Sequence, residues 1–140
     1  MNQFIIDASV AVKLFVDEQG ADEAMFVYRT SRLLAPDLLV PECANIFWKK
    51  VRRGELLAIE AETAANLLQQ CKIELRPTRE LIVAATRLSL LIDHPAYDCF
   101  YLALAQAEAC PLVTADQRLA NRVAERKLPI PLQMLSSFEA

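Results

Sequence analysis

The chain has 140 residues, of which 54% are hydrophobic and 24% are charged, a composition that supplies one packed core and excludes a disordered chain. The formal net charge of −3 excludes the global basic field of a protein that holds nucleic acid mainly through phosphate contacts. We therefore expect a single domain over residues 1–140, with an acidic balance that leaves room for bound cations.

Several targeting and binding signals are missing from the sequence. The uncharged stretch from Cys99 to Ala107 stops at Glu108, far short of the about 20 residues of a membrane-spanning helix. No Lys or Arg precedes Lys13, so no signal peptide is expected. The 4 cysteines are widely spaced, which indicates free thiols in the reducing cytoplasm. With only 2 glycines, a glycine-rich phosphate loop is excluded.

Apolar periodicity predicts an alternation of strands and helices along the chain. In chain order we expect a strand at 3–6, helices at 9–16 and 20–30, a strand at 33–35, helices at 37–52 and 59–70, a strand at 72–75, helices at 79–90 and 96–109, a strand at 112–113, a helix at 116–126 and an edge strand at 131–134. Asp37 is the expected N-cap of helix 37–52, and Thr78 is a capping-box candidate for helix 79–90. The alternation predicts an α/β fold, a three-layer sandwich in which a central parallel sheet of about five strands is flanked by helices.

Two of the apolar runs lead into an aspartate. Asp7 follows Phe4 to Ile6, and Asp116 follows Leu112 and Val113 after a short turn. The carboxyl ends of parallel strands form the ligand crevice of an open α/β sheet. These two acids, far apart in the sequence, are therefore expected to meet at one edge of the sheet.

Glu42 and Asp98 lie early in strongly apolar helical stretches, so both carboxylates are expected to be partly buried. A buried charge requires a partner, and Mg²⁺ or Mn²⁺ would pair several acids at once because hard cations take carboxylate oxygens. The alternative for Asp98 and Asp116 is helix capping. Together, the four acids predict a metal site.

Four blocks of this sequence together form a recognisable pattern. They are FIIDAS at 4–9, PDLLVPECAN at 36–45, YDCFYLALA at 97–105 and VTADQRL at 113–119. These blocks resemble the motifs of the PIN domain, and they are most similar to the VapC toxin branch of toxin–antitoxin systems. The resemblance covers nearly the whole chain, in order and at suitable spacing. It implies a PIN-like fold and a metal-dependent endoribonuclease that hydrolyses RNA phosphodiester bonds.

The same resemblance implies roles for individual residues. The catalytic and metal-binding acids would be Asp7, Glu42, Asp98 and Asp116. Ser9 and Thr114 would support the site through hydroxyl hydrogen bonds. The resemblance also implies a cognate antitoxin protein as partner, together with a homodimer. The apolar residues of helices 9–16 and 37–52 support such interfaces only if they exceed what one core needs.

Other residues follow from spacing and context. Asn45 lies three positions after Glu42 and shares its helix face, which suggests a supporting role. Lys49, Arg118 and Arg122 are candidates for holding flanking phosphates, with a solvated helix face as the alternative. His94 is the only histidine, so acid–base cleavage by a histidine pair is excluded. It precedes a proline in a turn and is expected at the surface.

Other functions remain as alternatives. A haloacid-type phosphatase needs a second acid two positions after the first, but residue 9 is a serine. A receiver domain needs an early acid pair that this chain lacks. A PIN nuclease of housekeeping RNA processing and a catalytically inactive PIN-fold binding module are the remaining alternatives.

Overall fold

The computed structural model describes residues 1–139, in which five strands form one parallel sheet with the order β3-β2-β1-β4-β5. The strands are β1 (Asn2–Ile6), β2 (Ser31–Pro36), β3 (Ile73–Arg76), β4 (Leu112–Thr114) and β5 (Leu132–Met134). The helices are α1 (Ala8–Ala11), α2 (Ala21–Thr30), α3 (Leu39–Arg52), α4 (Ala58–Gln70), α5 (Ile82–Ile92), α6 (Ala96–Glu108) and α7 (Gln117–Glu125), with 3₁₀ turns η1 (Val12–Leu14), η2 (Thr78–Leu81) and η3 (Leu135–Ser137).

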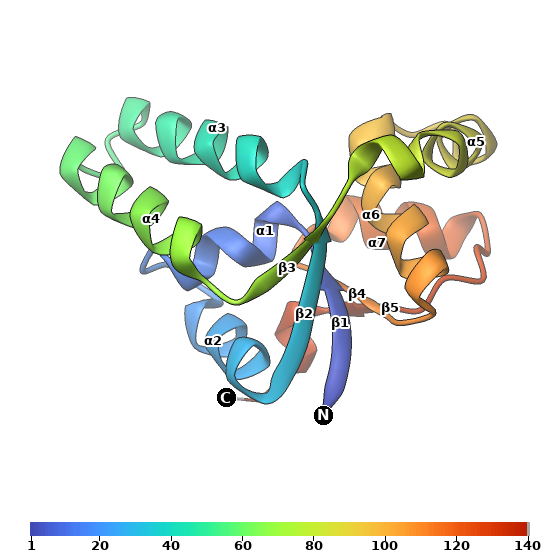
Figure 1. The fold of residues 1–140 in the computed structure, drawn as a ribbon, viewed down its shortest axis with the longest axis horizontal. Helices are drawn as coiled ribbons and strands as arrows, with labels where there is room; N and C mark the ends of the chain where they lie inside the picture. The colour runs from blue at the N-terminus through green and yellow to red at the C-terminus, as the bar shows by residue number, and fades with distance from the viewer. Residues whose placement is uncertain (140) are drawn as a thin grey trace.

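The sheet lies between two layers of helices. Helices α1 to α4 lie on one side of the strands, and α5 to α7 lie on the other (Figure 1). The expected α/β sandwich with a central parallel sheet is therefore confirmed. The expected edge strand is also found, since β5 pairs with β4 alone. No helix among residues 1–139 is long and apolar enough to cross a bilayer.

Strand β1 occupies the centre of the sheet because its side chains are apolar on both faces. Ile5 and Ile6 are fully buried, as expected for a strand covered by helices on both sides. The strand pairs with β2 on one side and with β4 on the other, and Ile6 lies opposite Val113. The residues that follow this pair, Asp7 and Thr114, consequently emerge side by side at the carboxyl edge of the sheet.

The N-terminal helix is shorter than the expected 9–16. Helix α1 covers Ala8–Ala11 and tightens into η1 over Val12–Leu14. The chain must then reverse, and Gly20 makes this possible by taking a φ of +92° before α2. In the segment 9–16 the apolar residues Val10, Val12 and Val16 are buried in the core, whereas Leu14 and Phe15 are only partly buried. The expected role of this segment in an interface stays a prediction.

Both expected helix caps were also wrong, for one tertiary reason. Helix α3 begins at Leu39, and Asp37 instead accepts a hydrogen bond from the Thr78 backbone N–H at 3.2 Å between Oδ1 and N. Thr78 opens the 3₁₀ turn η2, whose N-cap is Pro77, and α5 begins only at Ile82. The adjacent ends of β2 and β3 bring the two segments together, and their mutual hydrogen bond replaces the local caps.

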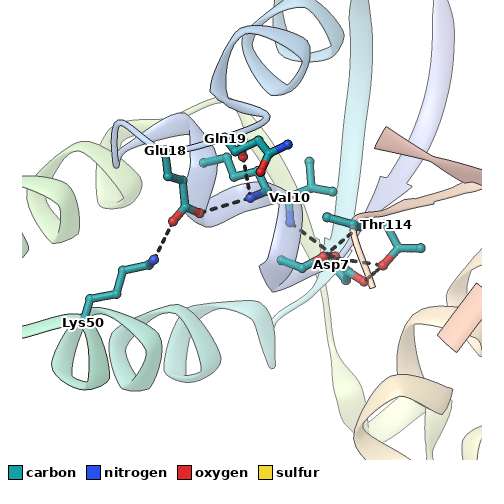
Figure 2. Close-up of polar contacts among 9 residues, drawn as sticks. Asp7, Val10, Glu18, Gln19, Lys50 and Thr114 are labelled. Atoms are coloured by element: carbon teal, nitrogen blue, oxygen red, sulfur yellow. Dashed lines mark hydrogen bonds and ion pairs between the residues drawn. The ribbon is translucent and has the colours of Figure 1, made fainter. Parts of the chain in front are cut away.

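A pair of lysines on one glutamate ties the N-terminal segment to α3. Glu18 accepts from Lys13 Nζ at 3.2 Å and from Lys50 Nζ at 2.5 Å, and Figure 2 shows Lys50 reaching across from its helix. The three side chains are 14% to 25% exposed. Burial by itself raises the pKa of Glu18, but the hydrogen bonds and charges of the two lysines outweigh it and lower the pKa. The interaction therefore stabilises the fold in its ionised form.

Replacing this carboxylate by an amide is expected to destabilise the protein. Glu18→Gln keeps the shape of the side chain but leaves two half-buried ammonium groups without a counter-charge, which should cost about 1–2 kcal/mol of unfolding free energy at pH 7. Because the pKa of Glu18 is lowered in the folded state, its contribution is present above the unfolded value of 4.5 and is lost as the pH falls below it. Urea unfolding of both proteins at several pH values measures the difference.

The neighbouring Asp17→Asn is the matched control, since Asp17 is exposed and forms no ion pair among the described residues. It should leave the stability within about 0.5 kcal/mol of wild type. Equal stability of Glu18→Gln and wild type at neutral pH, or a difference that widens in acid, would contradict the stabilising role of Glu18.

Candidate functional site

The Asp7 side chain lies where the central strand ends and α1 begins. Its Oδ1 accepts from the Ser9 hydroxyl at 2.5 Å and from the Val10 backbone N–H at 3.3 Å, which caps α1. Its Oδ2 accepts from the hydroxyl of Thr114, at the end of the adjacent strand β4. Figure 2 shows Asp7 between α1 and Thr114. The carboxylate is only 5% exposed, and all its hydrogen-bond donors among the described residues are neutral groups.

The two hydroxyl groups are themselves fixed in place. Ser9 Oγ accepts from the Ala115 backbone N–H at 3.0 Å, and Thr114 Oγ1 accepts from the Asp116 backbone N–H at 3.0 Å. Each hydroxyl oxygen therefore accepts a hydrogen bond from a backbone N–H that orients it, and each hydroxyl donates its own hydrogen bond to Asp7. Ser9 and Thr114 hold the carboxylate in one position and join the ends of β1 and β4.

Burial makes the charge on Asp7 costly. The pKa of Asp7 is raised from 3.8 to about 6, chiefly by desolvation and also by the nearby charge of Asp98, against the opposing hydrogen bonds of Ser9, Thr114 and Val10. No Lys or Arg among the described residues forms an ion pair with it. A buried carboxylate with a raised pKa and no cation partner is a feature of a binding site for a positive charge.

Glu42 and Asp98 belong to the same site. Glu42 lies in the first turn of α3 and accepts from the Tyr101 hydroxyl at 2.5 Å. Burial raises the pKa of Glu42, the Tyr101 hydrogen bond opposes that change, and the charge of Asp98 adds to it. Asp98 lies in the first turn of α6, whose N-cap is Pro95, so the capping alternative for Asp98 was wrong. Asp98 thus acts electrostatically on both Asp7 and Glu42.

Asp116 is placed at the same edge but is used differently. It is the N-cap of α7, and its Oδ1 accepts from the backbone N–H groups of Arg118 at 2.9 Å and Leu119 at 3.3 Å. Its own backbone N–H bonds to Thr114, so it is adjacent to the hydroxyls that hold Asp7. The alternative prediction, that Asp116 caps a helix, is therefore confirmed for Oδ1. The other carboxylate oxygen, Oδ2, accepts no hydrogen bond within residues 1–139.

The donor set suits a hard divalent cation. Within residues 1–139, no three acidic, histidine or cysteine side chains are grouped closely enough to hold a metal ion in the positions they take here. The available groups are nevertheless carboxylate oxygens, which are the ligands that Mg²⁺ or Mn²⁺ accepts. The charge of Asp98 raises the pKa of both Asp7 and Glu42, so these carboxylates act on one site. Bringing them onto one ion requires their side chains to move from these positions.

The remaining candidates lie outside this acidic cluster. Asn45, Lys49 and Arg118 are exposed, and Arg122 is half-buried on α7. Their roles stay predictions, since none of their side chains contacts an acid of the site through a hydrogen bond or ion pair in the described part of the chain; Arg118 donates only its backbone N–H to Asp116.

Two residues that contact the acids were missed from the sequence. Tyr101 holds Glu42, and the Nε2 atom of His94 lies 2.6 Å from Oδ2 of Asp98. The expectation that His94 is a surface residue was wrong, because its side chain is 13% exposed. Only Tyr101 had a signal in the sequence, since it lies three positions after Asp98 on the same helix, whereas His94 precedes the N-cap of α6.

Comparison with known proteins agrees with this geometry. The family model described as PIN domain matches residues 4–125. The chain is 30% identical over 126 residues to Ribonuclease VapC3 of Pyrobaculum aerophilum, covering 86% of this chain and 94% of that protein. The solved structure of PAE2754 from Pyrobaculum aerophilum is similar, with a TM-score of 0.66 and 22% identity over 97% of this chain and 92% of that one. VapBC-5 of Mycobacterium tuberculosis, described as a member of the VapBC family of toxin-antitoxin systems, has a TM-score of 0.53 and 12% identity over 96% of this chain and 98% of that one.

The sheet order, the acids at its carboxyl edge and these similarities define the class of protein. The chain belongs to the PIN-domain family. Its relatives within that family include VapC ribonucleases.

The buried charge predicts a pH-dependent stability difference between wild type and Asp7→Asn in the presence of a chelator. The pKa of Asp7 is raised from 3.8 to about 6, so its favourable contribution is complete below 3.8 and is lost as the pH rises through 6. The ionised form costs about 3 kcal/mol at pH 7.5. Asp7→Asn, which carries no charge, should therefore be the more stable protein at pH 7.5, and the difference should shrink below pH 5.

Urea unfolding in EDTA at pH 4.5, 6 and 7.5 measures this difference. The control Asp22→Asn removes an exposed carboxylate in the first turn of α2, where a small loss independent of Asp7 is expected. A stability difference between Asp7→Asn and wild type that does not change across this range would show that Asp7 is not a costly buried charge.

Proposed function

We propose that this chain is a metal-dependent endoribonuclease that hydrolyses RNA phosphodiester bonds and acts as the toxin of a toxin–antitoxin pair. The observation that carries the proposal is the buried Asp7 carboxylate, held by hydroxyl groups beside Glu42 and Asp98 at the carboxyl edge of a PIN-domain sheet. A relative that is 30% identical over most of both chains is named a ribonuclease, which supports the activity.

The cofactor in this proposal is Mg²⁺ or Mn²⁺, with Asp7, Glu42 and Asp98 as the residues that would hold it and Asp116 at the edge of the same site. When bound, such an ion lowers the pKa of a coordinated water and offsets the charge on the phosphate oxygens. The oxygen-only donor set and the missing counter-charge on Asp7 support this choice.

The protein side chains have distinct tasks in this scheme. Ser9 and Thr114 each donate a hydrogen bond to one oxygen of Asp7, so that carboxylate needs no rearrangement of its own. Tyr101 restrains Glu42 in the same way. Arg118, two positions after the Asp116 cap of α7, is the cation nearest in sequence to an acid of the site and would hold a flanking phosphate.

An antitoxin protein is the proposed partner, and a homodimer is the proposed assembly. A solved structure with a similar fold comes from a toxin-antitoxin system, which supports the first. Exposed apolar side chains that a partner could cover include Val40 and Trp48 on α3 and Leu90 and Leu91 on α5. The cytoplasm is the proposed location, in keeping with the 4 free cysteines.

Loss of one carboxylate is expected to abolish cleavage without unfolding the protein. Asp7→Asn should lower the rate of RNA cleavage at least about a hundredfold, because the amide cannot supply an anionic ligand. Mn²⁺ should raise the melting temperature of the wild-type protein and not that of Asp7→Asn, since only a folded state that binds the ion is stabilised. Cleavage of a fluorescent RNA and thermal unfolding with and without Mn²⁺ measure the two effects.

The exposed-carboxylate variant Asp22→Asn serves as control and should match the wild type in the rate of RNA cleavage and in the rise of melting temperature that Mn²⁺ produces. Undiminished RNA cleavage by Asp7→Asn, in protein free of contaminating nuclease, would overturn the proposed function.

Arg118 is expected to contribute to substrate binding. Arg118→Gln should raise KM for RNA by about threefold to tenfold with little change in kcat, and should weaken the dependence of binding on salt, because one phosphate contact is lost. Arg126→Gln, which removes an exposed arginine at the far end of α7, is the matched control. Kinetics at two salt concentrations distinguish them, and equal behaviour of the two variants would argue against a specific contact by Arg118.

A further inference from the structure

The only histidine of the chain lies against an acid of the proposed nuclease site. His94 Nε2 is 2.6 Å from Asp98 Oδ2, although the two residues belong to different segments, the turn after α5 and the first turn of α6. The imidazole is 13% exposed and the Asp98 side chain is 31% exposed. The histidine side chain is therefore largely buried, whereas the Asp98 side chain is partly exposed to solvent.

The backbone around His94 is held in place, so this contact is not a chance position of a mobile surface side chain. Helix α5 ends at Ile92, and Asp93 closes it in the left-handed conformation with a φ of +52°. The His94 backbone N–H donates to the Ser89 carbonyl at 3.2 Å, and the Ser89 hydroxyl donates to the His94 carbonyl at 2.6 Å. Pro95 follows with a φ of −53° and starts α6. Both polar backbone groups of His94 are thus engaged, and the ring is directed by a turn of defined shape.

The acid that His94 contacts has a central place among the three carboxylates. The charge of Asp98 raises the pKa of both Asp7 and Glu42, so it lies close enough to act on each of them. Asp7 is held by Ser9 and Thr114, and Glu42 is held by Tyr101. The His94 contact is the corresponding hydrogen bond for Asp98, and within residues 1–139 its side chain makes no other.

We propose that His94 is a positioning residue of the nuclease site, whose Nε2–H donates to Oδ2 of Asp98 and so leaves Oδ1 as the oxygen available to a divalent cation. The proposal rests on the proposed function for its link to RNA cleavage, but the hydrogen bond and its effect on cation binding stand on the geometry alone. A neutral imidazole with its proton on Nε2 is sufficient, so no change of protonation is required.

A positioning role predicts that glutamine and leucine at position 94 behave differently, whereas a purely structural role predicts no such difference. A hydrogen-bond donor at the reach of Nε2 should be enough, whether or not it is an imidazole. Glutamine places an amide NH₂ at a similar distance from the backbone, whereas leucine fills the space without a donor. The donor orients a ligand and keeps it in place, and loss of such a partner typically weakens metal binding by about tenfold to a hundredfold.

The test compares wild type, His94→Gln and His94→Leu by Mn²⁺ titration calorimetry at pH 8, by kcat and KM on a short RNA, and by thermal unfolding in EDTA. His94→Gln should bind Mn²⁺ within about threefold of wild type, and His94→Leu should bind about tenfold or more weakly. At subsaturating Mn²⁺, the kcat of His94→Leu should fall in proportion to its loss of Mn²⁺ affinity, with KM for RNA unchanged. The control Asp93→Asn keeps a residue that tolerates the left-handed conformation next to His94, and it should match the wild type.

Wild-type Mn²⁺ affinity in His94→Leu would overturn the proposal, and so would equal weakening in the Gln and Leu variants, which would mean that the imidazole itself is needed. An Asp98→Asn background supplies a second criterion, since His94→Leu should weaken Mn²⁺ binding much less there than in the wild-type background. Full additivity of the two changes would also contradict a role through Asp98.

Failure of the proposed function gives a different result. A wild-type protein that binds Mn²⁺ but does not cleave RNA would overturn the nuclease activity, while the affinities of the His94 variants would still decide the positioning role. A wild-type protein that binds no Mn²⁺ would overturn both.

Discussion

The structure depends on one buried carboxylate at the end of its central strand. Asp7 terminates β1, caps α1 through Oδ1 and is joined to β4 through Thr114, so a single side chain connects three elements of the fold. Its hydrogen bonds are those that a carboxylate needs when it leaves water, but they supply no positive charge. Burial therefore raises its pKa to about 6, and the folded protein carries an electrostatic cost that a bound cation would relieve.

Helix α6 connects the buried Asp7 to the other acids of the site. It carries Asp98, which acts on the other two acids, and Tyr101, which binds Glu42 from a fully buried position. Glu42 lies on α3. The two lysines that form ion pairs with Glu18 hold α3 against the segment after α1. A set of mutually repelling carboxylates is thus held together by packing and by neutral or remote partners. Sites of this kind reduce stability in exchange for function.

Much of this organisation could be read from the chain because it depends on short-range pattern. Apolar runs that lead into Asp7 and Asp116 predicted buried parallel strands that end in acids, and the sheet has that form. The predicted helix caps were wrong because Asp37 and Thr78, which are 41 positions apart, form a hydrogen bond with each other across the ends of β2 and β3. A periodicity argument includes no such partner, so it assigned each residue to its own helix.

The sequence by itself determined the alternation of strands and helices, the identity of the acids and the edge of the sheet at which they gather, because these follow from local hydrophobicity and from the direction of parallel strands. Only the tertiary structure decided what holds each acid. His94 and Tyr101 contact the site because a left-handed turn after α5 and the packing of α6 against the sheet bring them to Asp98 and Glu42. Hydrogen bonds between side chains require defined positions in space, and those positions arise only when the helices pack.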